Sequence, residues 1–274
     1  MTDTTIKEGM VLYAGYEEDD ARKYISDNGY TADDVKMVKS GDQVLVKARR
    51  AIEATSTDKN IRVIDFETTG MPDDENPHSI IEAAFVDVDT GEFWESLVKP
   101  TTEMDIRALA IHHITEDKAN KNGLDWDAAK KILDGADIYA AHNAEFEQKF
   151  YNPQGSVWIC TYKVALKLWP DAPSHSNQVL KYYLEIADKQ AHHPPHRALP
   201  DCFVTAEIIK KMLELTTIEE MIEITNQPPY LTKINFGKHY GKKFSELPRD
   251  YLEWIIKQDM DEGVTAAANR ELAA

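Results

Sequence analysis

The sequence predicts an α/β domain with a mixed sheet and flanking helices, preceded by a small α+β module and followed by a second small module. Short apolar runs that suit buried strands are interleaved with stretches of helical periodicity across residues 61–215. A polar stretch at 54–60 suits a linker, which sets residues 1–58 apart. Pro228-Pro229 opens a C-terminal module of residues 228–274, so the chain has three parts.

The N-terminal module carries the signals of a small α+β unit. Residues 10–14 predict a strand, residues 17–26 a short helix, and residues 35–48 a hairpin that turns at Ser40-Gly41-Asp42. No group of catalytic side chains occurs in this stretch. We therefore expect an adaptor or scaffold role, with a protein partner that the sequence does not identify.

The central domain combines strands and helices. Apolar runs predict strands at residues 61–64, 80–88, 92–98, 138–141 and 157–159. Asp89-Thr90-Gly91 is a turn between the second and third of these strands, so the first three predict an antiparallel meander. Helical periodicity predicts the flanking helices at residues 117–133, 145–151, 161–168, 177–186 and 198–215.

The last predicted helix of this domain, residues 198–215, contains Pro200. Proline is tolerated in the first turn of a helix, because the N–H group that it lacks has no intrahelical partner there. An apolar stripe at helical spacing marks the face that we expect to enter the core, and it consists of Cys202, Ala206, Ile209 and Leu213.

Length and composition limit the class of protein. The 274 residues suffice for one sizeable domain and one or two small modules. No apolar run approaches the roughly 18 residues of a membrane span, and the N-terminus lacks the basic-then-apolar order of a signal peptide. We expect a cytoplasmic protein with no membrane contact. Cys160 and Cys202 lie in apolar stretches without C-x-x-C spacing, so we expect reduced, structural thiols.

The formal net charge of −17 argues against binding nucleic acid by bulk electrostatics, because neutralising phosphates takes a basic surface. The charge is unevenly spread, however. Residues 228–257 contain six basic and three acidic residues, a net charge of +3, which leaves −20 for the rest. We predict a turn at Gly241, a helix at 249–258 and a frayed helical tail at 265–269. This segment is either a packing appendage or a handle for a polyanion, through Lys238, Lys242 and Lys243.

Two carboxylates at the end of the first central strand are the main chemical signal. Asp65 and Glu67 follow the apolar residues 61–64, and residues i and i+2 of a strand point to the same side. Like charges held that close repel each other unless a cation lies between them. The pair therefore predicts a divalent metal site, although the same pattern also fits a turn cap at Asp65 and a solvated Glu67.

Two further segments supply groups that such a site needs. Glu147 follows a predicted strand, and Asp201 opens the last helix of the domain, five residues after His196. Hard cations such as Mg²⁺ and Mn²⁺ take oxygen ligands, few of them from the protein. With Asp65 and Glu67 the chain offers four carboxylates, and His196 adds a group that titrates near neutral pH.

Three motifs built on these residues, at 65–70, 142–147 and 196–201, resemble those of the DEDDh family of 3′→5′ exonucleases, whose fold is ribonuclease-H-like. The resemblance extends from about residue 62 to about residue 256. It differs at Glu147, where the family has aspartate, so the extra methylene alters the geometry at one metal position while keeping a carboxylate. Further segments are similar, in the same order, to the exonuclease X branch of the family, at residues 110–116, 157–161, 168–170 and 236–242.

The resemblance implies metal-dependent hydrolysis of DNA from the 3′ end, with release of nucleoside 5′-monophosphates and with two Mg²⁺ or Mn²⁺ ions as cofactors. Asp65 is expected to bridge the two ions, Glu67 and Asp201 to complete one metal position, and Glu147 to hold the other ion. His196 is expected to take the proton from the attacking water.

Substrate-binding residues are implied as well. The loop of Thr68, Thr69 and Gly70 would receive the terminal nucleotide, and Ile111 and His112 would contact the end of the substrate. The motif at residues 142–147 also contains His142 and Asn143, which we expect to orient its last carboxylate by hydrogen bonds, although Asn143 is equally suited to capping the following helix. Phe66 is expected in the core, and Thr115 at a helix N-cap.

Single-stranded DNA is the favoured substrate, and RNA is an alternative. A different class of function also fits the sequence, namely a catalytically weak nucleic-acid-binding or inhibitory protein that retains the exonuclease fold. The acidic net charge and the glutamate at position 147 favour that alternative. Magnesium-dependent release of mononucleotides from a labelled oligonucleotide separates the two.

Overall fold

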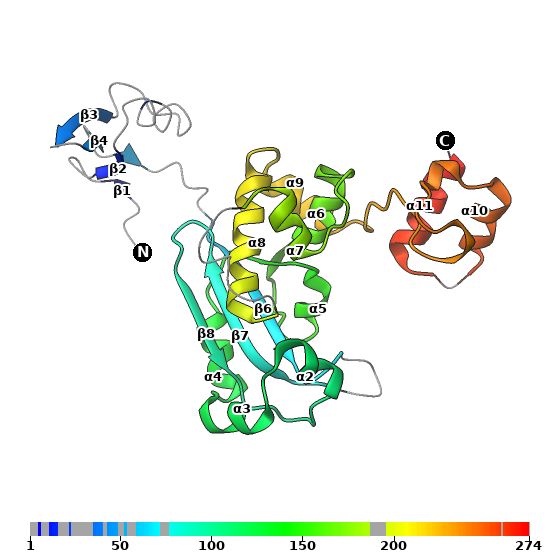
Figure 1. Cartoon of the computed structure of the whole chain (residues 1–274), viewed down its shortest axis with the longest axis horizontal. Coiled ribbons are helices and arrows are strands. Elements are labelled where there is room, and N and C mark those ends of the chain that lie inside the picture. The colour runs from blue at the N-terminus through cyan, green and yellow to red at the C-terminus, as the bar shows by residue number, and fades with distance from the viewer. Residues whose placement is uncertain are drawn as a thin grey trace. The chain divides into compact units, whose positions relative to one another are not determined.

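Figure 1 shows the computed structural model of the chain. It divides into two compact units, Met1–Lys59 and Asn60–Ala274. Within the described part of the chain, no helix is long and apolar enough to cross a bilayer. The cytoplasmic location and the separate module at 228–274 stay predictions. The structure describes Arg22 and the strands of the first unit, and then residues 59–71, 77–186, 196–258 and 260–273.

The first unit contains a three-stranded antiparallel sheet in the order β2-β4-β3 and a short antiparallel pair. Ser40 pairs with Gln43 where β3 meets β4, which confirms the predicted hairpin. The predicted helix at 17–26, apart from Arg22, the turn residues Gly41 and Asp42, and linker residues 54–58 lie outside the described residues. The strands are β1 (Thr5–Ile6), β2 (Val11–Gly15), β3 (Val35–Ser40), β4 (Gln43–Ala48) and β5 (Ile52–Glu53).

The second unit is built on a mixed sheet, as the sequence predicts. Its five strands lie in the order β10-β9-β6-β7-β8. The first three strands form the expected antiparallel meander, and the last two run parallel to the first. The first strand extends beyond its apolar run of residues 61–64 and includes Asp65 and Glu67, because its pairing with the next strand continues to Thr68, with a register shift after Glu67. The strands are β6 (Ile61–Thr68), β7 (Ile80–Asp87), β8 (Phe93–Leu97), β9 (Ile138–Ala141) and β10 (Val157–Cys160).

Helices cover both faces of this sheet (Figure 1). Val63 and Ala84 point into a core with α6, α7, α8 and α9, whereas Ile64 and Phe85 point into a second core with α4 and α5. The alternation follows from the pleat of the strands and decides which helices face each side chain. The helices are α4 (Trp126–Leu133), α5 (Ala144–Gln148), α6 (Thr161–Leu168), α7 (Asn177–Tyr183), α8 (Ala198–Leu213) and α9 (Ile218–Thr225).

Several helix predictions were wrong in detail. The single helix expected at 117–133 is two helices, α3 (Glu116–Asn122) and α4, because Gly123 ends α3 where the backbones of Ala119 and Lys99 leave no room for a side chain. Leu213 is exposed and Met212 takes its place in the core. Thr115 caps α3 as expected, accepting from the Lys118 N–H group. Two helices were not predicted, α2 (Ile106–His112) and α9.

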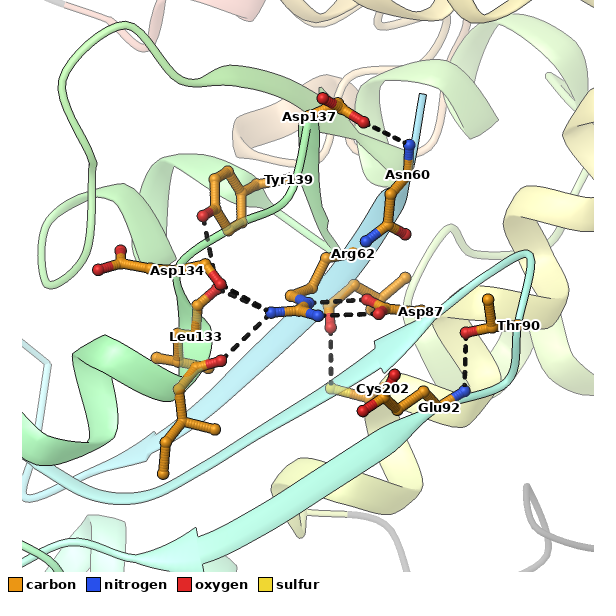
Figure 2. A network of polar contacts seen from close by, with 12 residues as sticks. Asn60, Arg62, Asp87, Thr90, Glu92, Leu133, Asp134, Asp137, Tyr139 and Cys202 are labelled. Atoms are coloured by element: carbon orange, nitrogen blue, oxygen red, sulfur yellow. Dashed lines mark hydrogen bonds and ion pairs between the residues drawn. The ribbon is translucent and has the colours of Figure 1, made fainter. Parts of the chain in front are cut away.

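A buried arginine anchors the start of β6 (Figure 2). The Arg62 guanidinium donates two hydrogen bonds to Asp87 in β7, at 2.7 and 2.8 Å, and its Nη1 donates to the Leu133 and Asp134 carbonyl oxygens at the end of α4, at 3.2 and 3.1 Å. Arginine suits this position because its planar fork matches a carboxylate bidentately. The contact fixes β6, which carries Asp65 and Glu67, against both a strand and a helix.

The C-terminal segment has a hydrophobic cluster of its own, which includes Ile234, Phe244 and Ile255. The predicted helix beginning at Arg249 is confirmed as α10 (Arg249–Ile256). The tail expected to fray forms a continuous helix, α11 (Glu262–Ala273), because Ala267 and Ala268 are buried in this cluster. Two single-turn 3₁₀ helices precede α10, η2 (Gly237–His239) and η3 (Phe244–Glu246).

Candidate active site

Three carboxylates meet where β6 faces α8. Asp65 and Glu67 lie on the α8 side of the sheet, because they alternate with Ile64 and Phe66, which pack on the other side. Asp201 is contributed by the first turn of α8. Oxygen atoms of the three side chains all lie within 4.8 Å of one another. The sequence prediction of a carboxylate cluster at this point is therefore matched by the geometry.

These carboxylates lie in a cavity of about 380 Å³. The cavity brings together all five residues expected to carry the chemistry, Asp65, Glu67, Glu147, His196 and Asp201. Residues from the end of β6, from α2 and from α5 complete its wall. They include Thr68, Gly70, Met71, Asp105, Arg107, Ala108, Ile111, His112 and Phe146.

Glu147 reaches the cavity from α5. Its residue is only 3% exposed, and its Oε2 atom is buried without a hydrogen-bond partner among the described residues. A buried carboxylate oxygen with no partner is unfavourable in the ionised state, unless a cation approaches it. Burial raises the pKa of Glu147 to about 8, with a contribution from the negative charge of Glu67.

The other three carboxyl groups are perturbed in the same direction. Burial and the charges of Asp201 and Glu147 raise the pKa of Asp65 well above its usual value. Burial and Asp201 raise the pKa of Glu67 to about 8, and burial raises that of Asp201. A hard divalent cation resolves this repulsion, and an all-oxygen set of donors fits Mg²⁺ or Mn²⁺. The residues therefore fit the metal that the sequence predicts.

We expect the stability of the metal-free protein to fall as the pH rises from about 5 to about 8. The pKa of Glu67 and of Glu147 is about 8 in the folded protein, whereas the ordinary value, which applies to the unfolded chain, is 4.5. Between pH 4.5 and pH 8 the folded protein therefore holds protons that the unfolded chain has lost. Melting temperatures in EDTA should decline across this range. Mn²⁺ should stabilise the protein more at pH 8 than at pH 5. An equal gain at both pH values would contradict the competition between protons and metal for these carboxylates.

Asp201 is held by hydrogen bonds from two directions. The Gln178 side chain in α7 donates to its Oδ1 at 2.7 Å, and the backbone N–H of His196 donates to its Oδ2 at 2.9 Å. His196 adopts a left-handed backbone conformation with φ 61°. Asn177 donates to the Asp201 carbonyl oxygen at 3.2 Å. These bonds fix the carboxylate while each oxygen keeps a lone pair for another partner.

An ion pair next to the cluster was not predicted from the sequence. Arg197 contacts the buried Glu82 of β7 through Nε, at 2.9 and 3.1 Å, and through Nη2, and the Ala198 N–H group donates to the same carboxylate at 3.0 Å. Glu82 lies opposite Glu67 in the sheet. The pair therefore fixes the start of α8, between His196 and Asp201, against the sheet.

Replacing Arg197 with alanine should lower the free energy of unfolding by about 3 kcal/mol, because Glu82 is buried and loses the half-exposed guanidinium that compensates its charge. Turnover should fall too, since the start of α8 loses its anchor. Denaturant unfolding measures the first effect. The matched control is Arg249→Ala, which removes an exposed ion pair with Glu253 and should cost less than about 1 kcal/mol. Equal losses in the two variants would contradict this role.

The expected substrate-binding residues divide into two groups. Thr68, Gly70, Ile111 and His112 line the cavity. Thr69 does not, because its side chain is fully buried against His78, Thr102 and Ser79, where it holds the end of β6. Gly70 lies so close to the His78 ring that a Cβ atom would approach it to 2.4 Å.

His142 and Asn143 are not brought to the cavity. The Nε2–H of His142 donates to the His175 carbonyl oxygen at 2.8 Å, and its Nδ1 accepts from the Thr161 hydroxyl at 2.9 Å. Neither bond reaches Glu147. Asn143 occupies the N-cap position of α5 with φ 75° but makes no side-chain cap bond. Phe66 lies in the core, edge-on to Trp126, as expected.

Of the three histidines His112, His142 and His196, the first two have both ring nitrogens in hydrogen bonds that hold the fold together. His112 accepts from the Ile114 N–H group at 3.0 Å and donates to the Thr68 carbonyl oxygen at 3.2 Å. Burial lowers the pKa of His112, and it lowers that of His142 to about 4. His196 lines the cavity, and no bond of its ring occurs among the described contacts. It is therefore the histidine best suited to exchange a proton there.

Comparisons with known proteins agree with these features. The sequence profile of the exonuclease family matches residues 63–209. Exodeoxyribonuclease 10 of Escherichia coli strain K12 is 35% identical over 208 residues, which cover 72% of this chain and 90% of the relative. The PolC-type DNA polymerase III of Oceanobacillus iheyensis is 28% identical over 181 residues, 60% of this chain and 12% of the relative. A solved structure, exonuclease X in complex with 5′ overhanging duplex DNA, has a TM-score of 0.53 and 32% identity, over 61% of this chain and 99% of that chain.

Proposed function

Since the chain belongs to the exonuclease family, whose ribonuclease-H-like architecture it shares, we propose that it is a metal-dependent 3′→5′ exodeoxyribonuclease. It would hydrolyse phosphodiester bonds from the 3′ end of DNA and release nucleoside 5′-monophosphates. The observation that carries this proposal is the meeting of Asp65, Glu67 and Asp201 within 4.8 Å in a cavity that also holds Glu147 and His196.

The four carboxylates of the cavity would together hold the metal ions. When bound, two Mg²⁺ or Mn²⁺ ions activate water and neutralise the charge of the phosphate and the leaving oxygen. Asp65, Glu67 and Asp201 would hold one ion, with Asp65 shared between both, and Glu147 would hold the second. Gln178 keeps Asp201 in position, and the Arg197–Glu82 pair keeps the start of α8 in position.

His196 would accept the proton of the attacking water at its ring. It lines the same cavity as the carboxylates, and its backbone N–H is bonded to Asp201, so the histidine and that carboxylate are fixed relative to each other. A general base needs this kind of fixed placement before its pKa matters.

The terminal nucleotide would lie at the end of β6. Thr68 and Gly70 line the cavity there, and Ile111 of α2, which is 52% exposed, offers an apolar surface to a base. His112 supports this wall by donating to the Thr68 carbonyl oxygen. DNA is preferred over RNA as the substrate because the relative named above is an exodeoxyribonuclease and the solved structure contains DNA.

The test uses single-stranded DNA and RNA oligonucleotides with a label on the 3′-terminal nucleotide. We expect labelled mononucleotide from DNA at the earliest times, in the presence of Mg²⁺ or Mn²⁺ and not in EDTA. A phosphorothioate linkage at the 3′ end should block release, whereas one at the 5′ end should not. Release that continues when the 3′ end is blocked would contradict the proposed 3′→5′ direction. Faster release from RNA would contradict the proposal that DNA is the substrate.

A further inference from the structure

A lysine and three aromatic rings contact one another on the C-terminal segment. The His239 ring packs edge-on against Tyr251 with 4.5 Å between centroids, and Tyr251 stacks on Trp254 at 5.2 Å with an angle of 27°. The Nζ atom of Lys238 lies 5.2 Å from the centre of the Tyr251 ring. Trp254 is 43% exposed, and Tyr240, which follows His239 in the chain, is 74% exposed. We call these five residues the aromatic patch.

The patch is built on a fixed loop. Gly237 adopts φ 63°, a conformation that favours glycine, and a Cβ atom there would approach the Tyr251 hydroxyl to 2.9 Å. Leu252 and Ile255, which alternate along α10 with Tyr251 and Trp254, are buried in the cluster beneath. The aromatic side chains are therefore held in place before any ligand binds, which lowers the entropic cost of binding.

The positive charge beside the patch is not neutralised. In the part of the chain that the structure describes, Lys238, Lys242 and Lys243 have no ion-pair partner, whereas Arg249 pairs with Glu253 at 3.2 Å. Several lysines elsewhere are paired, as in Lys130–Asp127, Lys210–Glu207 and Lys211–Glu214. Burial lowers the pKa of His239, and the charges of Lys238 and Lys242 lower it further against a smaller opposite effect of Asp250, so both cations lie near that ring.

We infer that the aromatic patch is a second nucleic-acid site, which binds single strands by stacking unpaired bases on Trp254 and Tyr240 while the lysines beside it contact phosphates. Exposed aromatic faces next to a line of positive charge are the combination that binds single strands without sequence preference. An apolar protein partner would use the rings but not the unpaired lysines. This site lies outside the cleavage cavity, and binding there does not require hydrolysis.

Binding can be measured without hydrolysis in the full-length Asp65→Asn chain in EDTA. The probe is a fluorescein-labelled oligothymidylate about 20 nucleotides long, followed by anisotropy. Trp254→Ala should weaken binding about ten-fold, within the range that stacking of one base provides. Trp254→Phe keeps a ring and should bind within about two-fold of the parent. Full retention of affinity by Trp254→Ala would overturn the inference.

Tyr230→Ala is the matched control. Tyr230 lies in the same segment and is also 43% exposed, but Arg270 covers its ring at 4.1 Å and donates to the Leu231 carbonyl oxygen. Its face is occupied, so its removal should leave the affinity for oligothymidylate unchanged. A loss equal to that of Trp254→Ala would show a general loss of folding of the segment and contradict the specific role of the patch.

Charge and stacking can be separated with a second ligand and with salt. Trp254→Ala should leave the affinity for a blunt duplex of equal length unchanged, since a duplex has no unpaired bases to stack. Lys238→Ala with Lys242→Ala should weaken both ligands and reduce the salt slope for the single strand by about 1.4, or about 0.7 for each phosphate contact. An unchanged salt slope would contradict the proposal that these lysines contact phosphates. Nucleotide release by the active chain tests the cleavage proposal separately.

Discussion

Asp65→Asn is expected to abolish nucleotide release, the largest single effect that we predict. Asp65 lies at the centre of the carboxylate cluster, and the charges of Asp201 and Glu147 both act on it. The amide keeps the size of the side chain but loses the negative charge that would be shared between two cations. Rates with Mg²⁺ and Mn²⁺ should fall to the level of the EDTA blank.

The same variant should melt at a higher temperature than the parent in EDTA at pH 8. The amide removes one charge from a group of carboxylates that repel each other, and the gain should shrink as the pH falls, because the raised pKa of Asp65 favours its neutral form in the folded protein. Asp171→Asn, which changes an exposed carboxylate, is the control and should alter neither rate nor melting. Substantial turnover by purified Asp65→Asn would sink the proposed mechanism.

Glu147→Ala should reduce the rate on the order of a thousand-fold, because in the proposed mechanism Glu147 would hold a cation that stabilises the charge developing in the transition state. Glu147→Gln should lose as much activity while keeping the packing of a residue that is almost fully buried. Both variants should also lose part of the thermal stabilisation that Mn²⁺ gives the parent. That second measurement does not depend on turnover.

Glu147→Asp distinguishes the active enzyme from a weak or inhibitory protein. If the parent is a working nuclease, the shorter aspartate, which the resemblance to the DEDDh family leads us to expect at this position, should be tolerated within about ten-fold, because the side-chain carboxylate is kept. A parent that is as slow as Glu147→Ala, together with a sharp gain in Glu147→Asp, would favour the inhibitory alternative. Rates of the three proteins with Mg²⁺ and Mn²⁺ decide between them.

Local patterns predicted the parts of the fold that depend on local physics. The strand at 138–141 and the helix at 161–168 were predicted with the observed bounds, because the first is a short apolar run and the second has helical periodicity. The break at Gly123 was missed because it depends on the approach of Lys99 and on the pairing of the next residue with Val98, both distant in sequence. The length of β6 likewise depends on β7.

In the candidate site too, local signals could be read from the sequence and contacts between distant residues could not. Asp65 and Glu67 could be placed together because a strand fixes residues two apart, and the resemblance added Asp201 and Glu147. The Arg197–Glu82 pair spans 115 residues and no local pattern predicts it. A signal was nevertheless present, since Glu82 interrupts the apolar run at 80–88. A charged residue inside such a strand needs a buried partner.

Because the acids in the cavity are crowded, binding of the proposed cations would compete with protonation of the carboxylates. At neutral pH the carboxyl groups of Glu67 and Glu147, with a pKa of about 8, carry protons in the metal-free protein, and an entering cation must expel them. The heat of metal binding should therefore depend on the ionisation enthalpy of the buffer. Lowering the pH and removing metal would then have the same effect, because protons and cations compete for the same carboxylates. The rate of hydrolysis would depend on the ratio of metal to protons even apart from the proton transfer in the reaction itself.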